Sequence, residues 1–536
     1  MSISQTHPNP SSIGSITSGR TTSCWEGPEG LTLVSDVFPS LTTDLNCDVC
    51  VIGGGISGLT TAYLCGRSGK RVTLIEDGIL GSGESGRSTA YLTTALDDRY
   101  SEVSKKWSAE TARLIAQSHA IAIDTVENII TNEGIACDFV RLPGYLFDGT
   151  LPSVDLQTEL EATRNAGIDA ITTSSLPHSQ DIGPCIVYPD QAQFHINKYL
   201  AGLAKACLNH QVKIFTRTHA REIHGGDEDI VAPVLSNEML TGSQPRVVTS
   251  DGHVISCGHI VEATNVPVSD RVTMYLKMKA YRTYVISAHV PHNSVAAALY
   301  FDTQDPYHYA RLAPVNEEVD LLMVGGEDHP TGQADDFSSR FLRLENWMRR
   351  IFPMAGNIVD RWSGQVIEPH DGLAFLGKNP NDAGNVFIIT GDSGMGMTHG
   401  TLGATIVTDL IFNRSNPFAS LYDPSRKPFH SLSESLTENL NTQRQYLDWL
   451  TSGDVKDIED VPVGCGRIVR RGLHKIAVYR GTDGQVTKCS AACPHLGAVV
   501  RWNDLEKTWD CPAHGSRFNA VGTVINGPAI KNLEPR

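Results

Sequence analysis

The sequence has no apolar run near the roughly 18 to 20 residues that a membrane-spanning helix needs, so we expect no membrane span. It also has no excess of positive charge: 44 Lys and Arg stand against 60 Asp and Glu, a formal net charge of −16. Nucleic-acid-binding proteins need a basic surface, so this balance argues against a nucleic-acid partner. Twelve cysteines in 536 residues are too few for a disulfide-stabilised scaffold.

The first 25 residues contain no acidic residue, one arginine (Arg20) and no apolar core. A secretory signal needs an apolar segment, and a mitochondrial transit peptide needs more arginine. We therefore expect a cytoplasmic protein, with the mitochondrial matrix as the less favoured alternative. Residues 1–44 are interpreted as a flexible N-terminal tail.

At 536 residues the chain is too long for one hydrophobic core, so two to four domains are expected. Strand and helix patterns over residues 45–412 predict the main body. Residues 413–454 are interpreted as a linker and tether helix. Residues 455–536 carry twelve basic and eight acidic residues and show short strand patterns, which indicates a separate domain. The tether helix is predicted from leucines at helical spacing: Leu432, Leu436, Leu440, Leu447 and Leu450.

A glycine-rich turn follows the first strong strand pattern of the body. The apolar residues 48–52 lead into Gly-Gly-Gly-Ile-Ser-Gly at 53–58, then a helical pattern at 59–67 and a strand at 71–75 that ends at Glu76. The glycines allow a tight turn, close approach of a pyrophosphate and close packing of the helix. The helix N-terminus would offer free N–H groups to the phosphates, and Glu76 would accept hydrogen bonds from a ribose. This context predicts a dinucleotide site.

A second strand, glycine-rich turn and apolar helix begin much later, at residue 385, with the turn at 391–398. An extended flavin needs such a second unit, because its ring end must also be held. The pairing resembles the D-amino-acid-oxidase-like (DAO) family of FAD oxidoreductases over residues 45–412. Residues 83–89, 212–223 and 361–372 resemble further conserved segments of that family.

The resemblance implies an α/β, Rossmann-like FAD-binding domain with an inserted antiparallel-sheet substrate domain. The FAD-binding parts are expected at about 45–100, 190–270 and 360–412, and the substrate-domain strands at about 140–190 and 275–360. The FAD contacts that the resemblance carries over are Gly53, Gly55, Gly58, Glu76, Gly86, Arg87, Thr89, Ala220, Gly394, Met395, Gly396 and Thr398.

The C-terminal segment contains two short motifs, Cys-Pro-His-Leu-Gly at 493–497 and Cys-Pro-Ala-His-Gly-Ser at 511–516. A zinc site of Cys₂His₂ type is the alternative, but zinc fingers separate a cysteine pair from a histidine pair. One Cys and one His in each half suit a Rieske [2Fe–2S] centre, where two thiolates hold one iron and two imidazoles the other. The motifs resemble the ligand loops of the Rieske family, which implies an all-β domain and the ligands Cys493, His495, Cys511 and His514.

Three positions depart from the Rieske proteins of respiratory complexes. Those proteins have an additional Cys in each ligand loop, where this chain has Ala498 and Ala513, and a Tyr where it has Phe518. Ser516 remains as a hydrogen-bond donor. Because fewer donors stabilise the added electron less, we expect a midpoint potential toward the lower part of the Rieske range of roughly −150 to +300 mV.

The two cofactors together predict an electron relay. A flavin takes two electrons at once and the cluster passes one at a time, so the flavin can connect an organic substrate to a one-electron redox partner or a reductase. The DAO resemblance implies oxidation at a C–N bond of a small amine or amino acid. His308 and Arg311 are the candidate catalytic residues. Three apart on a strand, they should face opposite sides, so we expect only one of them to reach the substrate.

Two alternative functions remain open. One is a flavin monooxygenase acting on a small organic substrate, because Gly391-Asp392 resembles the second flavin motif of aromatic hydroxylases. The other is an electron-transfer protein without a substrate of its own. A Rieske oxygenase is disfavoured, because its cluster lies N-terminally and it adds an iron site of two His and a carboxylate, which the sequence does not suggest. The joint layout resembles a group of DAO-like proteins with a C-terminal Rieske domain.

Overall fold

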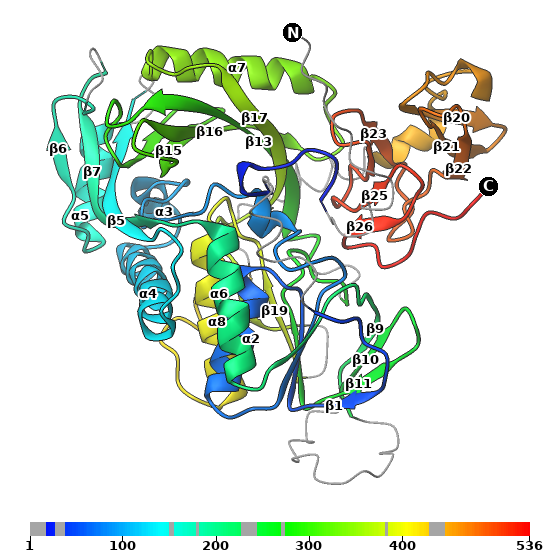
Figure 1. Ribbon diagram of the computed structural model, residues 1–536, viewed down its shortest axis with the longest axis horizontal. Helices are drawn as coiled ribbons and strands as arrows, with labels where there is room; N and C mark the ends of the chain where they lie inside the picture. The colour runs from blue at the N-terminus through cyan, green and yellow to red at the C-terminus, as the bar shows by residue number, and fades with distance from the viewer. Residues whose placement is uncertain are drawn as a thin grey trace.

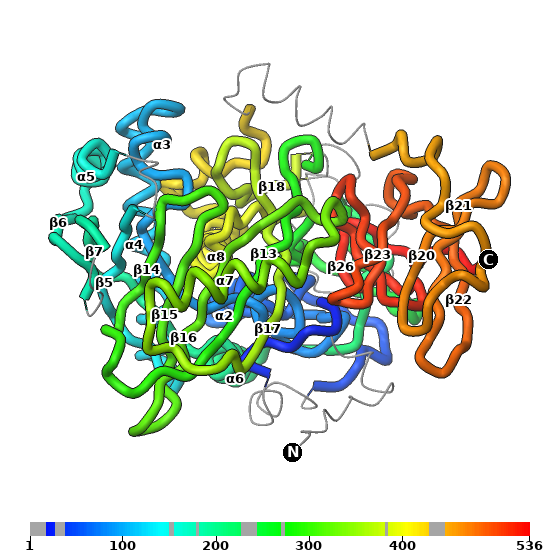
Figure 2. The backbone as a smooth tube through the Cα atoms, turned by 90° about the horizontal axis from the view of Figure 1, so that it is seen from above, coloured from blue at the N-terminus to red at the C-terminus, as the bar shows by residue number. Residues whose placement is uncertain are grey.

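The computed structural model describes residues 18–26, 38–148, 155–177, 182–226, 244–269, 274–380, 384–427 and 445–536. Within these ranges, no helix combines the length and the apolar character that crossing a membrane requires. The molecule has an α/β part, a large sheet covered by α7 and a small β domain at one side (Figures 1 and 2).

A six-stranded sheet in the order β18-β19-β12-β2-β3-β8 forms the core of the α/β part. Every residue of β2 and β3 is buried, as expected for parallel strands covered on both faces. This confirms the predicted Rossmann-like architecture. The elements of this layer are β2 (Val49–Ile52), β3 (Val72–Ile75), β8 (Lys213–Phe215), β12 (His259–Glu262), β18 (Phe375–Lys378), β19 (Val386–Thr390), α2 (Ile56–Arg67), α6 (Ile196–Asn209) and α8 (Gly396–Ile411).

A small sheet in the order β1-β11-β10-β9 lies beside this layer. Strands β10 and β11 form a hairpin in which Val247 pairs with Ile255, with Gly252 at positive φ in the turn. The bounds are β1 (Leu45–Asn46), β9 (Ala220–His224), β10 (Arg246–Thr249) and β11 (Val254–Ser256).

The third sheet runs in the order β17-β13-β16-β15-β14-β5-β7-β4, with β6 paired to β7. It is antiparallel except where β14 pairs with β5, which agrees with the predicted substrate domain. Its strands are β4 (Tyr91–Leu92), β5 (Val140–Phe147), β6 (Ile171–Thr173), β7 (Cys185–Gln193), β13 (Met278–Pro291), β14 (Leu299–Asp302), β15 (His308–Pro314), β16 (Val319–Pro330) and β17 (Ile358–Pro369).

Helices pack on the outer side and the end of this sheet. The apolar side of α7, including Phe341 and Trp347, is buried against it. Helix α4 begins after Ser108, whose side chain accepts from Thr111 N, and ends at Gly134 with φ of +62°. The bounds are η3 (Glu84–Arg87), α3 (Tyr100–Lys106), α4 (Ala109–Glu133), α5 (Leu156–Asn165) and α7 (Phe337–Ile351).

The C-terminal domain is built from two antiparallel sheets, β20-β21-β22 and β23-β24-β25-β26. The all-β prediction for this region is thereby confirmed. Its elements are η4 (Leu447–Leu450), η5 (Ile458–Asp460), β20 (Cys465–Arg471), β21 (His474–Arg480), β22 (Val486–Ser490), β23 (Arg501–Asn503), β24 (Thr508–Asp510), β25 (Arg517–Asn519) and β26 (Val524–Asn526).

Residues 18–26 differ from the flexible tail that we expected over 1–44. Trp25, in η2 (Cys24–Glu26), is 3% exposed, and its Nε1 donates to Ser88 O at 2.7 Å. Thr21 Oγ1 donates to Glu506 Oε1 at 2.6 Å. This segment is therefore packed between the body and the C-terminal domain, and for these residues the expectation was wrong. Burial of an indole ring and the hydrogen bonds are the physical reason.

The expected linker and tether helix also differ from the structure. Phe418 and Tyr422 are buried against the body, so the chain stays packed beyond α8. Leu447 and Leu450 are 57% and 76% exposed on a short 3₁₀ helix, so neither docks on the body as the predicted leucine stripe required. The other three leucines of that stripe lie outside the described residues.

Candidate cofactor sites

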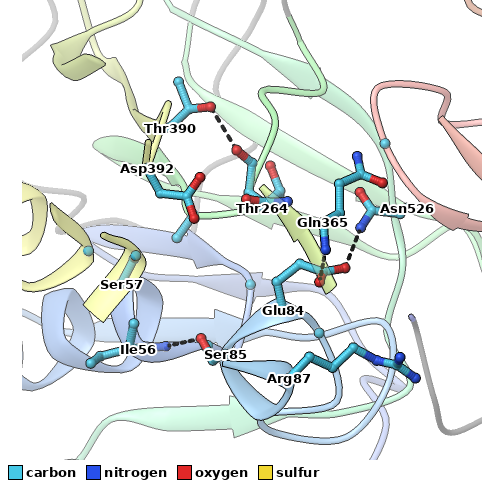
Figure 3. A pocket seen from close by; sticks show the side chains of 18 of the residues that line it. Ile56, Ser57, Glu84, Ser85, Arg87, Thr264, Gln365, Thr390, Asp392 and Asn526 are labelled. Carbon is cyan, nitrogen blue, oxygen red and sulfur yellow. Dashed lines mark hydrogen bonds between the residues drawn. The ribbon is translucent and has the colours of Figure 1, made fainter. Parts of the chain in front are cut away.

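A pocket runs from the turn after β2 to the inner side of the large sheet and then to the C-terminal domain. Figure 3 shows side chains from all three parts around it. The residues of the α/β part that line it include 53–57, 76–77, 83–85, 87–91, 218–220, 263–265, 389–390 and 396–397; the sheet contributes 283, 309 and 364–366, and the C-terminal domain contributes 524–527 and 529–530.

The first glycine-rich turn has the conformation that its sequence predicts. Gly53 has φ of +111°, and a Cβ there would clash with Ala263 O. A Cβ at Gly55 would lie 2.8 Å from Ser85 Oγ, inside the pocket wall. A Cβ at Gly58 would clash with Gly53 O, so this glycine permits α2 to pack on the turn and does not itself line the pocket.

Glu76 and Ala220 both line the pocket at the end where the resemblance places the adenosine. Glu76 Oε2 accepts from Gly54 N at 2.6 Å, and Oε1 accepts from Gly78 N at 2.9 Å. Burial raises the pKa of this carboxyl to about 8. The carboxylate thus ties the glycine turn to the end of β3, beside the position of a ribose.

The segment 86–89 contributes less to the pocket than the resemblance implied. Thr89 lines it, but Gly86 does not; a Cβ at Gly86 would clash with Gly81 O. The Arg87 backbone borders the pocket, whereas its guanidinium donates to Ser363 O at 2.7 Å and Glu506 Oε1 at 3.3 Å. Figure 3 shows this side chain extending away from Ile56 and Ser57. Arg87 and Thr89 thus line the pocket and Gly86 does not, and the contacts of Gly86, Arg87 and Thr89 with FAD stay a prediction.

At the second glycine-rich turn, too, the residues that line the pocket differ in part from the FAD contacts that the resemblance implied. Gly394 and Gly396 line the pocket, while Met395 packs in a hydrophobic cluster and Thr398 Oγ1 accepts from Thr93 N at 3.4 Å. Because α8 already begins at Gly396, helical geometry turns Met397, His399 and Gly400 toward the pocket instead. These three are absent from the FAD contacts that the resemblance carried over, although a helix start assigned at Gly396 would have indicated them.

Several buried polar atoms along the pocket have no hydrogen-bond partner within the described part of the chain: Asn265 Nδ2, Gln365 Oε1 and Asn526 Oδ1. Buried polar groups are normally hydrogen-bonded, so a long polar ligand is the expected partner. An FAD molecule would fit this pocket. The glycine-rich turns leave room for it, the unpaired polar atoms offer hydrogen bonds, and the N-terminus of α2 offers free N–H groups to its phosphates.

Neither candidate catalytic residue is among the residues that line this pocket. His308 faces α7, where it pairs with Asp302 at 3.0 Å and Glu327 at 3.3 Å and stacks on Trp347. Arg311 does lie on the opposite side of β15, as strand alternation predicted. Its buried Nη1 donates hydrogen bonds to three backbone carbonyls, those of Thr89, Ala90 and Phe194.

The four predicted cluster ligands come together on two loops, 491–499 after β22 and 511–516 after β24. A hydrogen bond between the Cys493 and Cys511 thiols lowers the pKa of Cys493. The rings of His495 and His514 have centroids 5.0 Å apart, and burial lowers the pKa of His514 to about 3. Sulfur ligands thus form one pair and neutral imidazoles the other, which fits a Rieske cluster.

The cluster loops pack directly on the flavin body. The ring of Tyr275 lies 4.7 Å from that of His495 and 5.6 Å from that of His514. Gln365, a pocket residue, donates from Nε2 to Gly515 O at 3.1 Å. A Cβ at Gly515 would lie 2.8 Å from Gln365 Nε2, so the approach requires glycine. No local sequence signal could have revealed Tyr275 or Gln365.

Ion pairs fix the same interface. Buried Glu506 accepts from Arg87 at 3.3 Å and Arg282 at 3.1 Å, and these arginines lower its pKa to about 2 against the effect of burial. Glu84 Oε1 accepts from Asn526 Nδ2 at 3.3 Å, as Figure 3 shows. The C-terminal domain is therefore a wall of the flavin pocket.

Comparisons with known proteins agree with both sites. Residues 48–410 match the DAO family of FAD-dependent oxidoreductases, and residues 450–535 match the Rieske [2Fe–2S] domain. The putative Rieske 2Fe-2S iron-sulfur protein YhfW of Bacillus subtilis (strain 168) is 31% identical over 502 residues, covering 93% of this chain and 94% of that protein.

More distant relatives match the body alone. The gamma-glutamylputrescine oxidoreductase of Escherichia coli (strain K12) is 22% identical over 410 residues, covering 73% of this chain and 90% of that protein. Glycine oxidase from Geobacillus kaustophilus shares the fold with a TM-score of 0.57 at 18% identity, covering 72% of this chain and 99% of that one. The chain thus belongs to the DAO family of FAD-dependent oxidoreductases and carries a Rieske [2Fe–2S] domain at its C-terminal side.

Proposed function

We propose that this enzyme oxidises the C–N bond of a small amine or amino-acid-like molecule and relays the electrons through its cluster to a one-electron acceptor. FAD bound in the pocket supplies two-electron oxidation of the substrate, and the [2Fe–2S] group supplies one-electron transfer. The observation that carries the proposal is the shared wall: Gln365 lines the flavin pocket and bonds the loop that holds His514.

The relatives support the choice of bond. The names of gamma-glutamylputrescine oxidoreductase and glycine oxidase designate an amine and an amino acid. The large sheet contributes Thr283, Tyr309 and residues 364–366 to the pocket, so the substrate is expected between that sheet and the flavin ring.

Residues of this chain support the relay by packing. Tyr275 fills the space between both imidazole ligands and the body, and it is 6% exposed. Residues 524–530 border the flavin pocket from the cluster's own domain. These residues would hold FAD and the [2Fe–2S] cluster in one packed unit, in which electrons could pass between the two groups.

An anaerobic substrate screen of the holoprotein tests the proposal. Amines and amino acids are added under exclusion of oxygen, the flavin absorption band is followed, and electron paramagnetic resonance (EPR) reports the cluster. We expect bleaching of the flavin and then the signal of the reduced cluster. Reduction by NAD(P)H with no reduction by any C–N compound would contradict the proposal.

A variant without the cluster separates the two halves of the proposal. Cys511→Ala removes one thiolate ligand while leaving the flavin pocket residues in place. Substrate should still bleach its flavin, and the EPR signal should be lost. If the flavin of this variant passed electrons to the acceptor as fast as the wild type, the relay would be wrong.

A further inference from the structure

Three tyrosines and two aspartates gather beside the ring end of the flavin pocket. We call Tyr91, Asp97, Tyr307, Tyr309 and Asp328 the tyrosine–carboxylate cluster. Tyr91 and Tyr309 line the pocket, with ring centroids 5.7 Å apart. Tyr307 stacks at 6.0 Å from Tyr309. The cluster brings together β4, β15 and β16 with the loop after β4.

Neither carboxyl lines the pocket, but each lies next to a residue that does. A Cβ on Gly394, which lines the pocket, would lie 2.5 Å from Asp97 Oδ2 and 3.4 Å from Tyr307 Oη. Asp328 Oδ1 is buried, and no hydrogen-bond partner for it exists within the described ranges. Thr283, a pocket residue only 7% exposed, faces this carboxyl: burial raises the pKa of Asp328, and a hydrogen bond with the Thr283 side chain lowers it. Asp328 therefore lies directly behind the pocket wall at Thr283.

The nearby guanidinium groups are already committed elsewhere. Among the described residues that line the pocket, Arg87 is the single Arg or Lys. Its guanidinium donates hydrogen bonds to Ser363 O and Glu506. Arg282 and Arg311 do not line the pocket; Arg282 pairs with Glu506 through Nη2, although its Nε and Nη1 have no partner among the described residues, and Arg311 donates to three carbonyls. Arg99 donates to Leu96 O and Asp302 O. A substrate carboxylate at this end would therefore have two buried carboxyls behind the pocket wall and, among the described lining residues, no Arg or Lys besides Arg87, which is unfavourable in a buried site.

We propose that the tyrosine–carboxylate cluster is the substrate-recognition site and that it selects a protonated aliphatic amine without an α-carboxylate. Aromatic faces attract an ammonium group, and the carboxylates accept its N–H bonds. The inference rests on the proposed function, since it names the class of C–N compound. It goes beyond that function by excluding α-amino acids as preferred substrates.

Matched pairs of compounds test the selection. Putrescine and ornithine, and cadaverine and lysine, differ by one α-carboxylate. With the anaerobic holoprotein, the diamine of each pair should half-reduce the flavin at a concentration about tenfold or more below that of the amino acid. If the amino acids act at equal or lower concentrations, the inference is overturned while C–N oxidation stands. If neither class reduces the flavin, the proposed function fails first.

A binding measurement avoids dependence on turnover. tert-Butylamine has no hydrogen on the carbon next to nitrogen, so it can bind without being oxidised. Titrated into the oxidised holoprotein and followed by calorimetry, it should bind, and Asp328→Asn should weaken its binding about tenfold. Asn is nearly isosteric, so FAD content, melting temperature and the cluster's EPR signal should stay unchanged.

Asp457→Asn is the matched control, because Asp457 pairs with Arg471 on the surface of the C-terminal domain. It should leave tert-butylamine binding unaltered. Failure of tert-butylamine to bind the wild type, or equal binding by the Asp328→Asn variant, would overturn the inference. A second variant, Asp97→Asn, should also weaken tert-butylamine binding. If neither variant weakens it, the result contradicts the proposed site.

Discussion

Three buried arginines near the pocket have functions that depend on where their guanidinium groups point. Arg87 and Arg282 meet Glu506 across a domain boundary, and Arg311 meets backbone carbonyls beside β4. The charge of a buried guanidinium needs a partner, so each of the three is directed by its contacts, and neither Arg282 nor Arg311 lines the pocket. At this scale the pocket is acidic and aromatic, which is the basis of the amine selectivity argued above.

The affinity for tert-butylamine should fall as the pH is lowered from about 7 to about 6. Burial raises the pKa of Asp97 to about 7 and that of Asp328 to about 6, so acid removes the negative charges that attract the ammonium. Calorimetric titrations over this range check it. The groups that act on these two carboxyls, besides each other, are Asp98, Arg99, Glu368, Glu327, His308, Arg340, Tyr91, Tyr307 and Tyr309.

The Asp328→Asn variant serves as the control, since only the Asp97 part of the pH dependence should persist. Binding that strengthens on acidification would show that the neutral carboxyls, rather than the ionised ones, recognise the ligand.

Ser516→Ala should lower the midpoint potential of the cluster. Ser516 Oγ accepts from Ala529 N at 3.0 Å and faces Cys493, so its hydroxyl hydrogen is available to the cluster side. A lost donor destabilises the added electron by about 1 kcal/mol, the net worth of one hydrogen bond. An EPR redox titration measures the shift. A wild-type midpoint near the top of the Rieske range, or a rise in the variant, would contradict this expectation.

At the scale of elements, the turn between β23 and β24 holds the C-terminal domain on the body. Glu506 in this turn receives hydrogen bonds from Thr21, Arg87, Arg282 and Ser363. These donors come from the N-terminal segment, η3, β13 and β17, so one carboxylate joins four separate pieces of chain. The interface is a fixed junction, in contrast to a domain held by a linker alone.

Glu506→Ala should lower the free energy of unfolding by about 3–5 kcal/mol, because it leaves two buried guanidinium groups without their partner. Denaturant unfolding measures this, and stopped-flow EPR should show slower reduction of the cluster. The control is Asp457→Ala, which breaks the exposed pair with Arg471 and removes the side-chain cap of η5, and should cost about 0.5–2 kcal/mol. Equal losses in the two variants would show that the junction is not held by charge.

The pH dependence of this junction follows from the lowered pKa of Glu506, about 2 in the folded protein against about 4.3 in the unfolded chain. A carboxyl with a lowered pKa contributes stability above its unfolded value, and that contribution is lost as the pH falls toward the folded value. Unfolding free energies measured from pH 5 downward should therefore fall more steeply in the wild type than in Glu506→Ala. Parallel curves would contradict it.

At the scale of the whole molecule, both cofactor sites depend on one contact surface. The loop that carries His514 touches Gln365 of the flavin pocket, and residues 524–530 of the same domain border that pocket. Removing the C-terminal domain would open the flavin site, so we expect flavin retention and the proposed electron relay to depend on the same surface.

Gly515→Ala should slow electron transfer from flavin to cluster while leaving both cofactors bound. An added Cβ would clash with Ala280 and press on Gln365. Gly497→Ala is a closely matched control. Gly497 has φ of +81° and Gly515 has φ of +80°, so alanine causes the same backbone strain at both positions. At Gly497, however, nothing lies within 4 Å of the added Cβ. Stopped-flow absorbance of the flavin with EPR of the cluster compares them. Equal rates in the two variants would mean that strain, and not the interface, sets the rate.

Local chemistry accounts for what could be predicted from the sequence. The turn at Gly53 and Gly55 and the four cluster ligands are set by spacing over a few residues, because backbone sterics and ligand chemistry act at that range. The strand and helix order of the body likewise follows from short-range hydrophobic patterns. These features specified the two cofactors and the fold class.

Long-range packing decided the rest. Whether Arg87 faces FAD or Glu506 depends on a partner 419 residues away in the chain, and no local pattern contains that information. The same holds for Trp25, which the sequence placed in a tail, and for Asn526, which reaches the flavin pocket from the cluster domain. The sequence by itself determined which cofactors bind. Only the tertiary structure decided that they share a wall, because that wall exists only when distant segments bury their surfaces together.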